Sequence, residues 1–386
     1  MVTIAGASVS RFSRHADGAG FRDLARTTLL AALAESALAP EDIDCLVFAG
    51  ESDFFTLQLN PATVIAQDCE LTHAAAFRVE GGGASGQLAV QAAAARILSG
   101  LSRIAAVIGA DMTATALPGD TLRQLYSHSF DAMTDGLTGI TATQVYALSW
   151  QAFAAAQGLG DPDLARVTIA HRGHACANPA AHLPRRHTRE EIAASPLIAS
   201  PYRRLHCSPL SDGAAAIILA APDALPATRR HAPRIVGMGA ATDRPFAQRT
   251  DPGQFTAKTR AMQAACKMAG ATPADVGLAE IYDAYAGAAL QGLRALGLSG
   301  RPGQDFAEGR FAADGLLPVN LSGGLLGQGA APGATGVAQV ATCALLLEGR
   351  YPGASPARPP RLALADTHGG ICSNAAVTLI AQAEAA

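Results

Sequence analysis

The chain has 386 residues, a formal net charge of −3, 49% hydrophobic residues and only 5% aromatic ones. The balance of 29 basic and 32 acidic residues excludes a general electrostatic attraction to nucleic acid. No run of 18 or more apolar residues occurs, so no membrane span is predicted, and residues 1–13 lack the basic and long apolar regions of a secretory signal. We therefore expect a cytoplasmic protein with two cores or one large α/β body.

The seven cysteines lie far apart in the sequence, and none forms a CxxC pair. Their spacing predicts neither a zinc ribbon nor a thioredoxin-type redox motif, and we expect no metal site. In a cytoplasmic protein the expected state of these residues is a reduced thiol, most often buried as a small hydrophobic side chain.

In chain order, the first half of the sequence alternates apolar runs with helical patterns. These segments are residues 2–8, 23–36, 42–48, 87–99, 103–109 and 214–220. A glycine-rich turn at residues 81–86 precedes the second of the two helices. Because the apolar runs are continuous rather than alternating, they are typical of strands that helices cover on both faces.

The second half repeats this order. Its segments are the apolar runs 234–240 and 275–281, a glycine-rich stretch at 322–336, and the runs 361–365 and 375–381. A repeat at about half the chain length indicates a duplicated unit.

These patterns predict the division of the chain. We expect an N-terminal half at residues 1–225 and a C-terminal half at residues 232–386, joined through the polar, proline-containing stretch 222–233. Residues 113–205 differ in character and form an insertion in the first half. An insertion of this length could carry a binding surface or be a solvated helical subdomain.

A glycine-rich turn that opens a helix, such as residues 81–86, presents free N–H groups at the positive end of the helix dipole. The turn could bind a phosphate, stabilise an oxyanion or hold a nucleophile. Tight packing of the helix against a strand explains the glycines equally well. The sequence SPLSDGAAA at residues 208–216 is more simply a turn before a buried strand.

Tyr282 and Asp283 directly follow the apolar run 275–281. A phenol and a carboxylate at the carboxyl end of a central strand lie where α/β folds build their sites. Two further loops belong to the same half: NLSGG at residues 320–324, which continues to GATG at 333–336, and DTHGGICS at 366–373.

Together these segments resemble the thiolase superfamily, in particular the sterol-carrier-protein-like thiolases, over essentially the whole chain. The duplicated halves, the insertion, SPLSDGAAAIIL and NLSGG followed by GATG occur in the family's order, and TREEI at residues 188–192 matches its loop domain. The resemblance implies an α/β fold of five αβαβα layers, built from two duplicated halves with a loop-domain insertion in the first. It also implies a homodimer, an acyl-CoA substrate and no cofactor except the coenzyme A of that substrate.

The departures from the family pattern bear on the chemistry. Gly83 stands where the family has its nucleophilic cysteine, so covalent acyl transfer from this position is impossible. The run GAA at residues 329–331 stands where the family has Gly-His-Pro. His368 and Gly370 lie in the final loop, and Cys372 is offset by several positions from the cysteine of the family.

The resemblance and the residue types together suggest roles. Backbone N–H groups of Gly83 and Gly370 could form an oxyanion hole for a thioester. Tyr282 could exchange a hydrogen bond or a proton with a substrate hydroxyl, Asp283 could orient it or act as a base, and His368 is the other candidate base. The alternatives are a buried structural tyrosine and a loop histidine bonded to backbone.

For substrate binding we expect Asn320, Ser322 and Gly323 of the NLSGG loop. Arg185 and Arg186 of the insertion could contact the phosphates of coenzyme A, because guanidinium groups pair well with phosphate. The same arginines could equally lie on a solvated helix face.

A Gly-Gly-Gly-Ala turn without cysteine, paired with Tyr282 and Asp283, is similar to the thiolase-like retro-aldolases of steroid side-chain degradation. This likeness implies cleavage of a β-hydroxyacyl-CoA into a ketone and a shorter acyl-CoA, together with a small zinc-ribbon/OB-fold (DUF35-type) partner. Two alternatives stay open. One is an acyltransferase of the acetyl-CoA acetyltransferase type that uses another nucleophile, such as Cys372; the other is a non-catalytic subunit that binds acyl-CoA or scaffolds an active partner.

Overall fold

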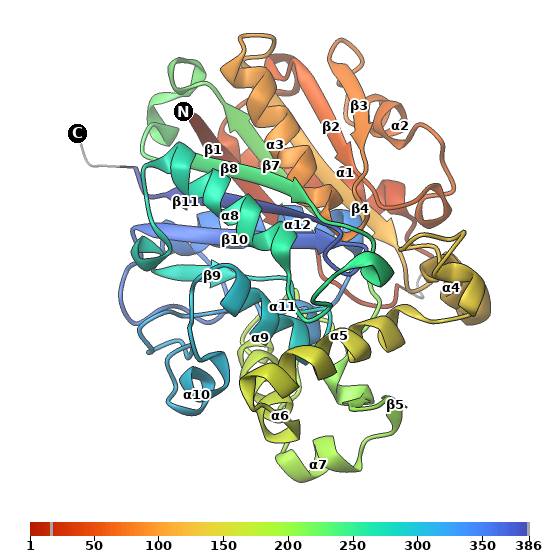
Figure 1. The fold of residues 1–386 in the computed structure, drawn as a ribbon. Helices are drawn as coiled ribbons and strands as arrows, with labels where there is room; N and C mark the ends of the chain where they lie inside the picture. The colour runs from red at the N-terminus through yellow and green to blue at the C-terminus, as the bar shows by residue number, and fades with distance from the viewer. Residues whose placement is uncertain (16–17, 384–386) are drawn as a thin grey trace.

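The computed structural model describes residues 1–15 and 18–383 (Figure 1). Within these residues the large sheet contains the strands β1 (Val2–Val9), β2 (Cys45–Ala49), β3 (Ala75–Val79), β4 (Ile104–Met112), β7 (Asp212–Ala220), β8 (Arg234–Thr242), β9 (Leu278–Glu280), β10 (Leu362–Gly369) and β11 (Asn374–Ala381). Their order across the sheet is β3-β2-β4-β7-β1-β8-β11-β10-β9. Each apolar run predicted from the sequence overlaps a strand of this sheet.

Helices flank the sheet and fill the space between its two parts. They are α1 (Phe21–Ser36), α2 (Pro61–Asp68), α3 (Ser85–Leu98), α4 (Gly119–Tyr126), α5 (Ala142–Gln157), α6 (Asp161–Ala175), α7 (Arg189–Ala194), α8 (Thr256–Ala269), α9 (Ala286–Ala295), α10 (Pro302–Ala307), α11 (Gly324–Gly327) and α12 (Pro332–Leu347). A small separate hairpin is made by β5 (Leu197–Ala199) and β6 (Tyr202–Arg203).

Both halves pair their strands in the same pattern. β2 is parallel to β4, and β7 runs antiparallel between β4 and β1. Correspondingly, β9 is parallel to β10, and β11 runs antiparallel between β10 and β8. A parallel bridge from Val319 to Ala279 takes the place of β3 in the second half. The duplicated α/β fold is thus confirmed, whereas the limits 1–225 and 232–386 stay predictions.

Apolar side chains divide into layers because alternate residues of a strand face opposite sides of the sheet. On β2, Phe48 packs in the cluster that contains α1 and α2, whereas Val47 packs in the cluster that contains α3 and α12. On β10, Ala363 joins this middle cluster and Leu364 joins the one that contains α8 and α9. The result is the expected αβαβα arrangement, with α3 and α12 in the central layer.

The central layer depends on small residues. α12 is buried along its whole length except at Leu345. A Cβ atom on Gly86 of α3 would lie only 2.7 Å from the Cα atom of Gly336 on α12, so glycine is required where these helices touch. The composition, rich in glycine and alanine, therefore follows from two helices packed between two parts of one sheet.

Residues 113–205 leave the sheet after β4 and return at β7, carrying α4 to α7. Although they belong to the first half in sequence, they pack on the second half: Trp150 of α5 and Leu164 of α6 share an apolar cluster with Leu290 of α9. Figure 1 shows α5, α6 and α7 gathered below the sheet, beside α9. In the described part of the chain, no helix combines the length and apolar character needed to cross a bilayer.

Candidate active site

Glycine-rich turns from the two halves meet at one end of the central layer. One turn leads into α3, and the other connects β10 to β11. The side chain of Asn374 joins them, because its Nδ2 donates to the carbonyl oxygen of Gly81 at 2.9 Å and its Oδ1 accepts from the N–H of Gly369 at 2.8 Å. A Cβ atom on Gly82 would lie 3.5 Å from the Cα atom of Gly369. Gly370, with a φ of 54°, continues the second turn.

Tyr282 fills the space beside Gly83. A Cβ atom on Gly83 would lie 2.4 Å from the Tyr282 hydroxyl oxygen and 2.5 Å from the carbonyl oxygen of His368. Only 7% of Tyr282 is exposed. Burial, and after it the negative charge of Glu51, raises the pKa of Tyr282 above its ordinary value, so the phenol is neutral and can donate a hydrogen bond.

His368 lies on β10 with its ring against that of Tyr282, at a centroid distance of 4.6 Å. Its Nε2 is 2.6 Å from the hydroxyl oxygen of Tyr146 on α5, whereas Nδ1 has no hydrogen-bond partner among the described residues. Burial, together with the positive charges of Lys258 and Arg249, holds the pKa of His368 well below its ordinary value. The imidazole is therefore neutral at physiological pH.

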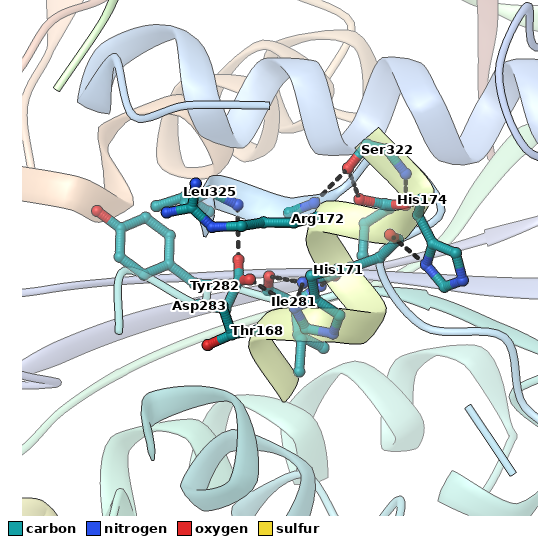
Figure 2. Close-up of polar contacts among 12 residues, drawn as sticks. Thr168, His171, Arg172, His174, Ile281, Tyr282, Asp283, Ser322 and Leu325 are labelled. Carbon is teal, nitrogen blue, oxygen red and sulfur yellow. Dashed lines mark hydrogen bonds and ion pairs between the residues drawn. The ribbon is translucent and has the colours of Figure 1, made fainter. Parts of the chain in front are cut away.

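Asp283 is fully buried and faces the insertion rather than the Tyr282 hydroxyl. Its Oδ2 lies 2.6 Å from Nδ1 of His171 on α6, and its Oδ1 accepts from the N–H of Leu325 on α11 at 2.6 Å. Figure 2 shows the carboxylate held between these groups and the phenol of Tyr282 directed away from it. Asp283 therefore fastens α6 and α11 to the end of β9. His171 is not among the residues predicted from the sequence, since a lone histidine in a helix carries no signal.

The residues expected to bind substrate in the NLSGG loop are buried and bonded to neighbouring elements. The side chain of Asn320 accepts from the N–H of Ile281 at 2.7 Å and donates to its carbonyl oxygen at 3.1 Å. Both the N–H and the hydroxyl of Ser322 donate to the carboxylate of Glu280. A Cβ atom on Gly323 would lie 2.5 Å from a side-chain atom of α6. These contacts hold the segment before α11 against β9 and α6.

Arg185 and Arg186 lie on the surface of the insertion, before α7, and both are exposed. The guanidinium group of Arg185 pairs with Glu191 at 2.9 Å. Arg186 reaches α6, where its Nη1 would lie 3.4 Å from a Cβ atom on Gly173. Both side chains thus stand on the insertion, apart from the buried group formed by Gly83, Tyr282 and His368.

A pocket of about 500 Å³ opens beside the two glycine turns. Its walls include Gly82, Gly370 and Tyr126 of α4, as well as the carboxyl groups of Glu51, Glu80 and Asp243. Glu51 is not among the residues predicted from the sequence. A usable signal was nevertheless present, because this acid follows the run 42–48 just as Tyr282 and Asp283 follow the run 275–281.

The pKa of Glu51 is perturbed. Burial and the negative charge of Asp111 raise it to about 8, and a hydrogen bond from the Tyr126 hydroxyl, 3.2 Å from Oε2, opposes this shift. Burial also raises the pKa of Asp111 to about 7, while the N–H of Gly333 donates to its carboxylate. A carboxyl group that is perturbed in this way and lines a cleft, as Glu51 does, is typical of a functional site.

A buried ion pair lies behind the pocket. Lys258 of α8 and Asp366 of β10 are fully buried and contact each other. Asp366 also accepts a hydrogen bond from the backbone N–H of Tyr282 at 3.2 Å. The pair therefore ties the start of the Tyr282 segment to β10 and α8.

Known proteins resemble this chain in sequence and in fold. A family model described as thiolase C-terminal domain-like matches residues 239–382. An acetyl-CoA acetyltransferase from Methanothermobacter thermautotrophicus is 31% identical over 90% of this chain and 91% of its own length. A steroid side-chain-cleaving aldolase from Thermomonospora curvata is 28% identical over 87% of this chain and 88% of its own length. Among solved structures, the Ltp2-ChsH2(DUF35) aldolase has a TM-score of 0.83 at 24% identity and covers 99% of this chain, with 97% of its own chain matched.

Identity at this level over nearly the whole length, on a duplicated αβαβα fold, shows that the chain belongs to the thiolase superfamily. The resemblance inferred from the sequence motifs, to thiolases and to the aldolases related to them, is confirmed. The candidate active site of this chain lies beside its two glycine turns.

Proposed function

We propose that this protein cleaves a β-hydroxyacyl-CoA by a retro-aldol reaction, without a covalent cysteine intermediate. The contact between Gly83 and Tyr282 carries the proposal, because position 83 has no nucleophile and a phenol occupies the place of its side chain. Similarity to a steroid side-chain-cleaving aldolase supports the same class of reaction.

The reaction breaks the bond between the α and β carbons of the acyl group. A base removes the proton of the β-hydroxyl, the ketone forms, and the electron pair of the broken bond passes to the α carbon as a thioester enolate. A proton then adds to the α carbon. These steps need an acid, a base and an oxyanion hole but no nucleophile. Backbone N–H groups of Gly83 and Gly370 would bind the enolate oxygen, each contributing about 3 kcal/mol.

Tyr282 would act as the acid. Its neutral phenol lies beside Gly83, where the enolate would be held, and can deliver a proton to the α carbon. The ring of His368 packs against the phenol ring of Tyr282, and its Nε2 bonds to the hydroxyl of Tyr146. His368 would therefore keep the phenol in place. Asp283 would be a positioning residue, because both of its oxygens are bonded to the insertion and to α11.

Two further groups of residues would bind the coenzyme A and acyl parts of the substrate. Exposed Arg185 and Arg186 would pair with the phosphates of coenzyme A. Asn320, Ser322 and Gly323 would shape the wall beside the acyl group through the segment that they hold. Coenzyme A enters only as part of the substrate, and no further cofactor is proposed.

Two protein partners are also proposed. β3 is an edge strand of the sheet, and its residues are partly exposed. An unpaired edge of this kind supports a homodimer in which a second copy covers it. The likeness to the Ltp2-ChsH2(DUF35) aldolase supports a small DUF35-type protein as a second partner.

The purified protein, and its native complex isolated from the source cells, can be incubated with a β-hydroxyacyl-CoA that carries a bulky ring system at the β carbon. Liquid chromatography with mass spectrometry should find a ketone and a shorter acyl-CoA in equal amounts. Coenzyme A binding without any cleavage in either preparation would overturn the proposal and leave a non-catalytic acyl-CoA-binding subunit.

A second candidate is acyl transfer, which the 31% identity to an acetyl-CoA acetyltransferase favours. The thiol nearest the second glycine turn is that of Cys372. This side chain is fully buried, and burial raises the pKa of its thiol to about 12, so it is a weak nucleophile at neutral pH. Mass spectrometry of the intact protein after incubation with acetyl-CoA tests this candidate: an acetyl adduct on Cys372 supports transfer, and an unmodified chain argues against it.

A further inference from the structure

Glu51 reaches the pocket from the carboxyl end of β2. It lines the wall together with Tyr126, whose hydroxyl bonds to its Oε2. A Cβ atom on Gly82 would lie 3.9 Å from its Oε1, and the next residue of the same turn, Gly83, contacts the Tyr282 hydroxyl. The carboxyl group and the phenol therefore flank one short glycine turn, and the charge of Glu51 is felt at Tyr282.

The retro-aldol step still needs a base, and the residues expected from the sequence do not supply one. Tyr282 is a neutral phenol. Asp283 has both oxygens bonded and is fully buried. His368 is 1% exposed, and burial holds the pKa of its imidazole well below the ordinary value, so it is a weak base. Glu51 combines a proton acceptor with a position in the pocket wall.

We propose that Glu51 is the general base that takes the proton of the substrate's β-hydroxyl, an inference that rests on the proposed function. As the O–H proton moves to the carboxylate, the C–C bond breaks and its electron pair passes to the α carbon. The Tyr282 hydroxyl then donates its proton to that carbon. Finally, the proton held by Glu51 passes to Tyr282, so both groups regain their starting forms and no further reactant is consumed.

Several titratable and charged groups face Glu51 from the elements packed around it. They are Asp111 on β4, Tyr126 at the end of α4, His128 just after α4, Glu80 before the glycine turn, Tyr282 after β9 and Asp243 after β8. Arg78 on β3 acts on Asp111. Burial and Asp111 together place the pKa of Glu51 at about 8, close to the pH at which an enzyme base works best. Because the base must be ionised, the rate should rise with pH through about 8 and level off above it.

The variant Glu51→Gln keeps the size of the side chain and the oxygen that accepts from Tyr126, but it cannot take a proton. We expect kcat to fall about 100- to 10,000-fold with little change in KM, and the rise in rate near pH 8 to disappear. Glu51→Asp should keep the pH dependence at a lower rate. A folded Glu51→Gln protein, with an unchanged Tm, that retains the wild-type rate and pH dependence would overturn the inference.

Asp243→Asn is the matched control, since it removes a different carboxylate from the wall of the same pocket. We expect this variant to keep the rise in rate near pH 8. Loss of that rise in Asp243→Asn to the same extent as in Glu51→Gln would mean that the charge of the pocket, and not a base at position 51, sets the pH dependence.

A second measurement separates this inference from the proposed function. Wild-type and Glu51→Gln proteins are incubated with the β-hydroxyacyl-CoA, and ketone and shorter acyl-CoA are measured by mass spectrometry. A wild-type protein that cleaves none of this substrate overturns the proposed function. Cleavage by the wild type that survives in a folded Glu51→Gln protein overturns the base and leaves the proposed function standing.

Discussion

The hydroxyl oxygen of Tyr282 lies 2.4 Å from the point where a side chain on Gly83 would begin. The two residues belong to different halves of the chain, so one half supplies the turn and the other the group that fills it. Real Cβ atoms do not approach an oxygen this closely. Neither alanine nor cysteine therefore fits at position 83 while Tyr282 keeps its place.

We expect Gly83→Ala to lower the free energy of unfolding by about 1–3 kcal/mol, because the added methyl group overpacks a buried site. It should also lower kcat by displacing Tyr282. Urea denaturation and steady-state kinetics measure the two effects. In the double variant Gly83→Ala/Tyr282→Phe, loss of the hydroxyl should restore part of the stability. Strictly additive losses would contradict the contact.

Tyr282→Phe should reduce kcat for retro-aldol cleavage about 100- to 10,000-fold, because the proposed acid is removed, and should leave KM within a few-fold of the wild type. Tyr285→Phe is the matched control. Its side chain is partly buried, and its hydroxyl bonds to Thr143 at 2.8 Å instead of contacting the glycine turn. Similar losses of rate in both variants would show that the effect is structural.

Tyr126→Phe removes the hydrogen bond that favours the charged form of Glu51, so the pKa of Glu51 should rise further above about 8. The rise in rate with pH should then move to higher pH by roughly 0.5–1 unit. A pH–rate profile measured between pH 6 and pH 10 tests this expectation. A shift towards lower pH, or none, would mean that Glu51 does not set the profile.

Lys258→Met leaves the buried carboxyl group of Asp366 without its cation. Burial already raises the pKa of Asp366 in the folded protein, and loss of Lys258 raises it further. An acid with a raised folded pKa destabilises the fold as pH rises towards that pKa, and not below its unfolded pKa. We therefore expect a loss of about 3–5 kcal/mol near pH 8 and a smaller one near pH 5, measured by urea denaturation. Equal losses at both pH values would contradict this coupling.

The duplicated architecture could be predicted because its signals are local. Continuous apolar runs of five to seven residues identify buried strands, and the run 214–220 lies within β7 as observed. Glycine-rich turns before helices recur in both halves, and α3 begins at Ser85, within two residues of the helix expected at 87–99. Tyr282 and His368 were accessible to the same reasoning because each stands at the end of a strand or in a glycine turn.

Other parts of the site carried a weaker local signal or none. Glu51 follows the apolar run 42–48, but nothing in the sequence marks it as a partner of Tyr126, and His171 is a single histidine in a helix of ordinary composition. Each gains its role from a residue more than 70 positions away in the sequence: Glu51 from Tyr126, and His171 from Asp283. Asn320 and Ser322 had a signal in the sequence, as polar residues of the NLSGG loop that were expected to bind substrate. In the folded chain their side chains are bonded within the protein, to Ile281 and Glu280.

By itself, the sequence determined the α/β class, the two halves and the absence of a side chain at position 83, since these follow from residue type and spacing along the chain. Only the tertiary structure decided which groups face one another. β2 lies in one part of the sheet and β9 and β10 lie in the other. The contact of Gly86 with Gly336 lets the central helices between these parts pack tightly enough for the two glycine turns to meet. Because proton transfer depends on distances between atoms from distant segments, the acid–base partnership of Tyr282 and Glu51 could be inferred only from the folded chain.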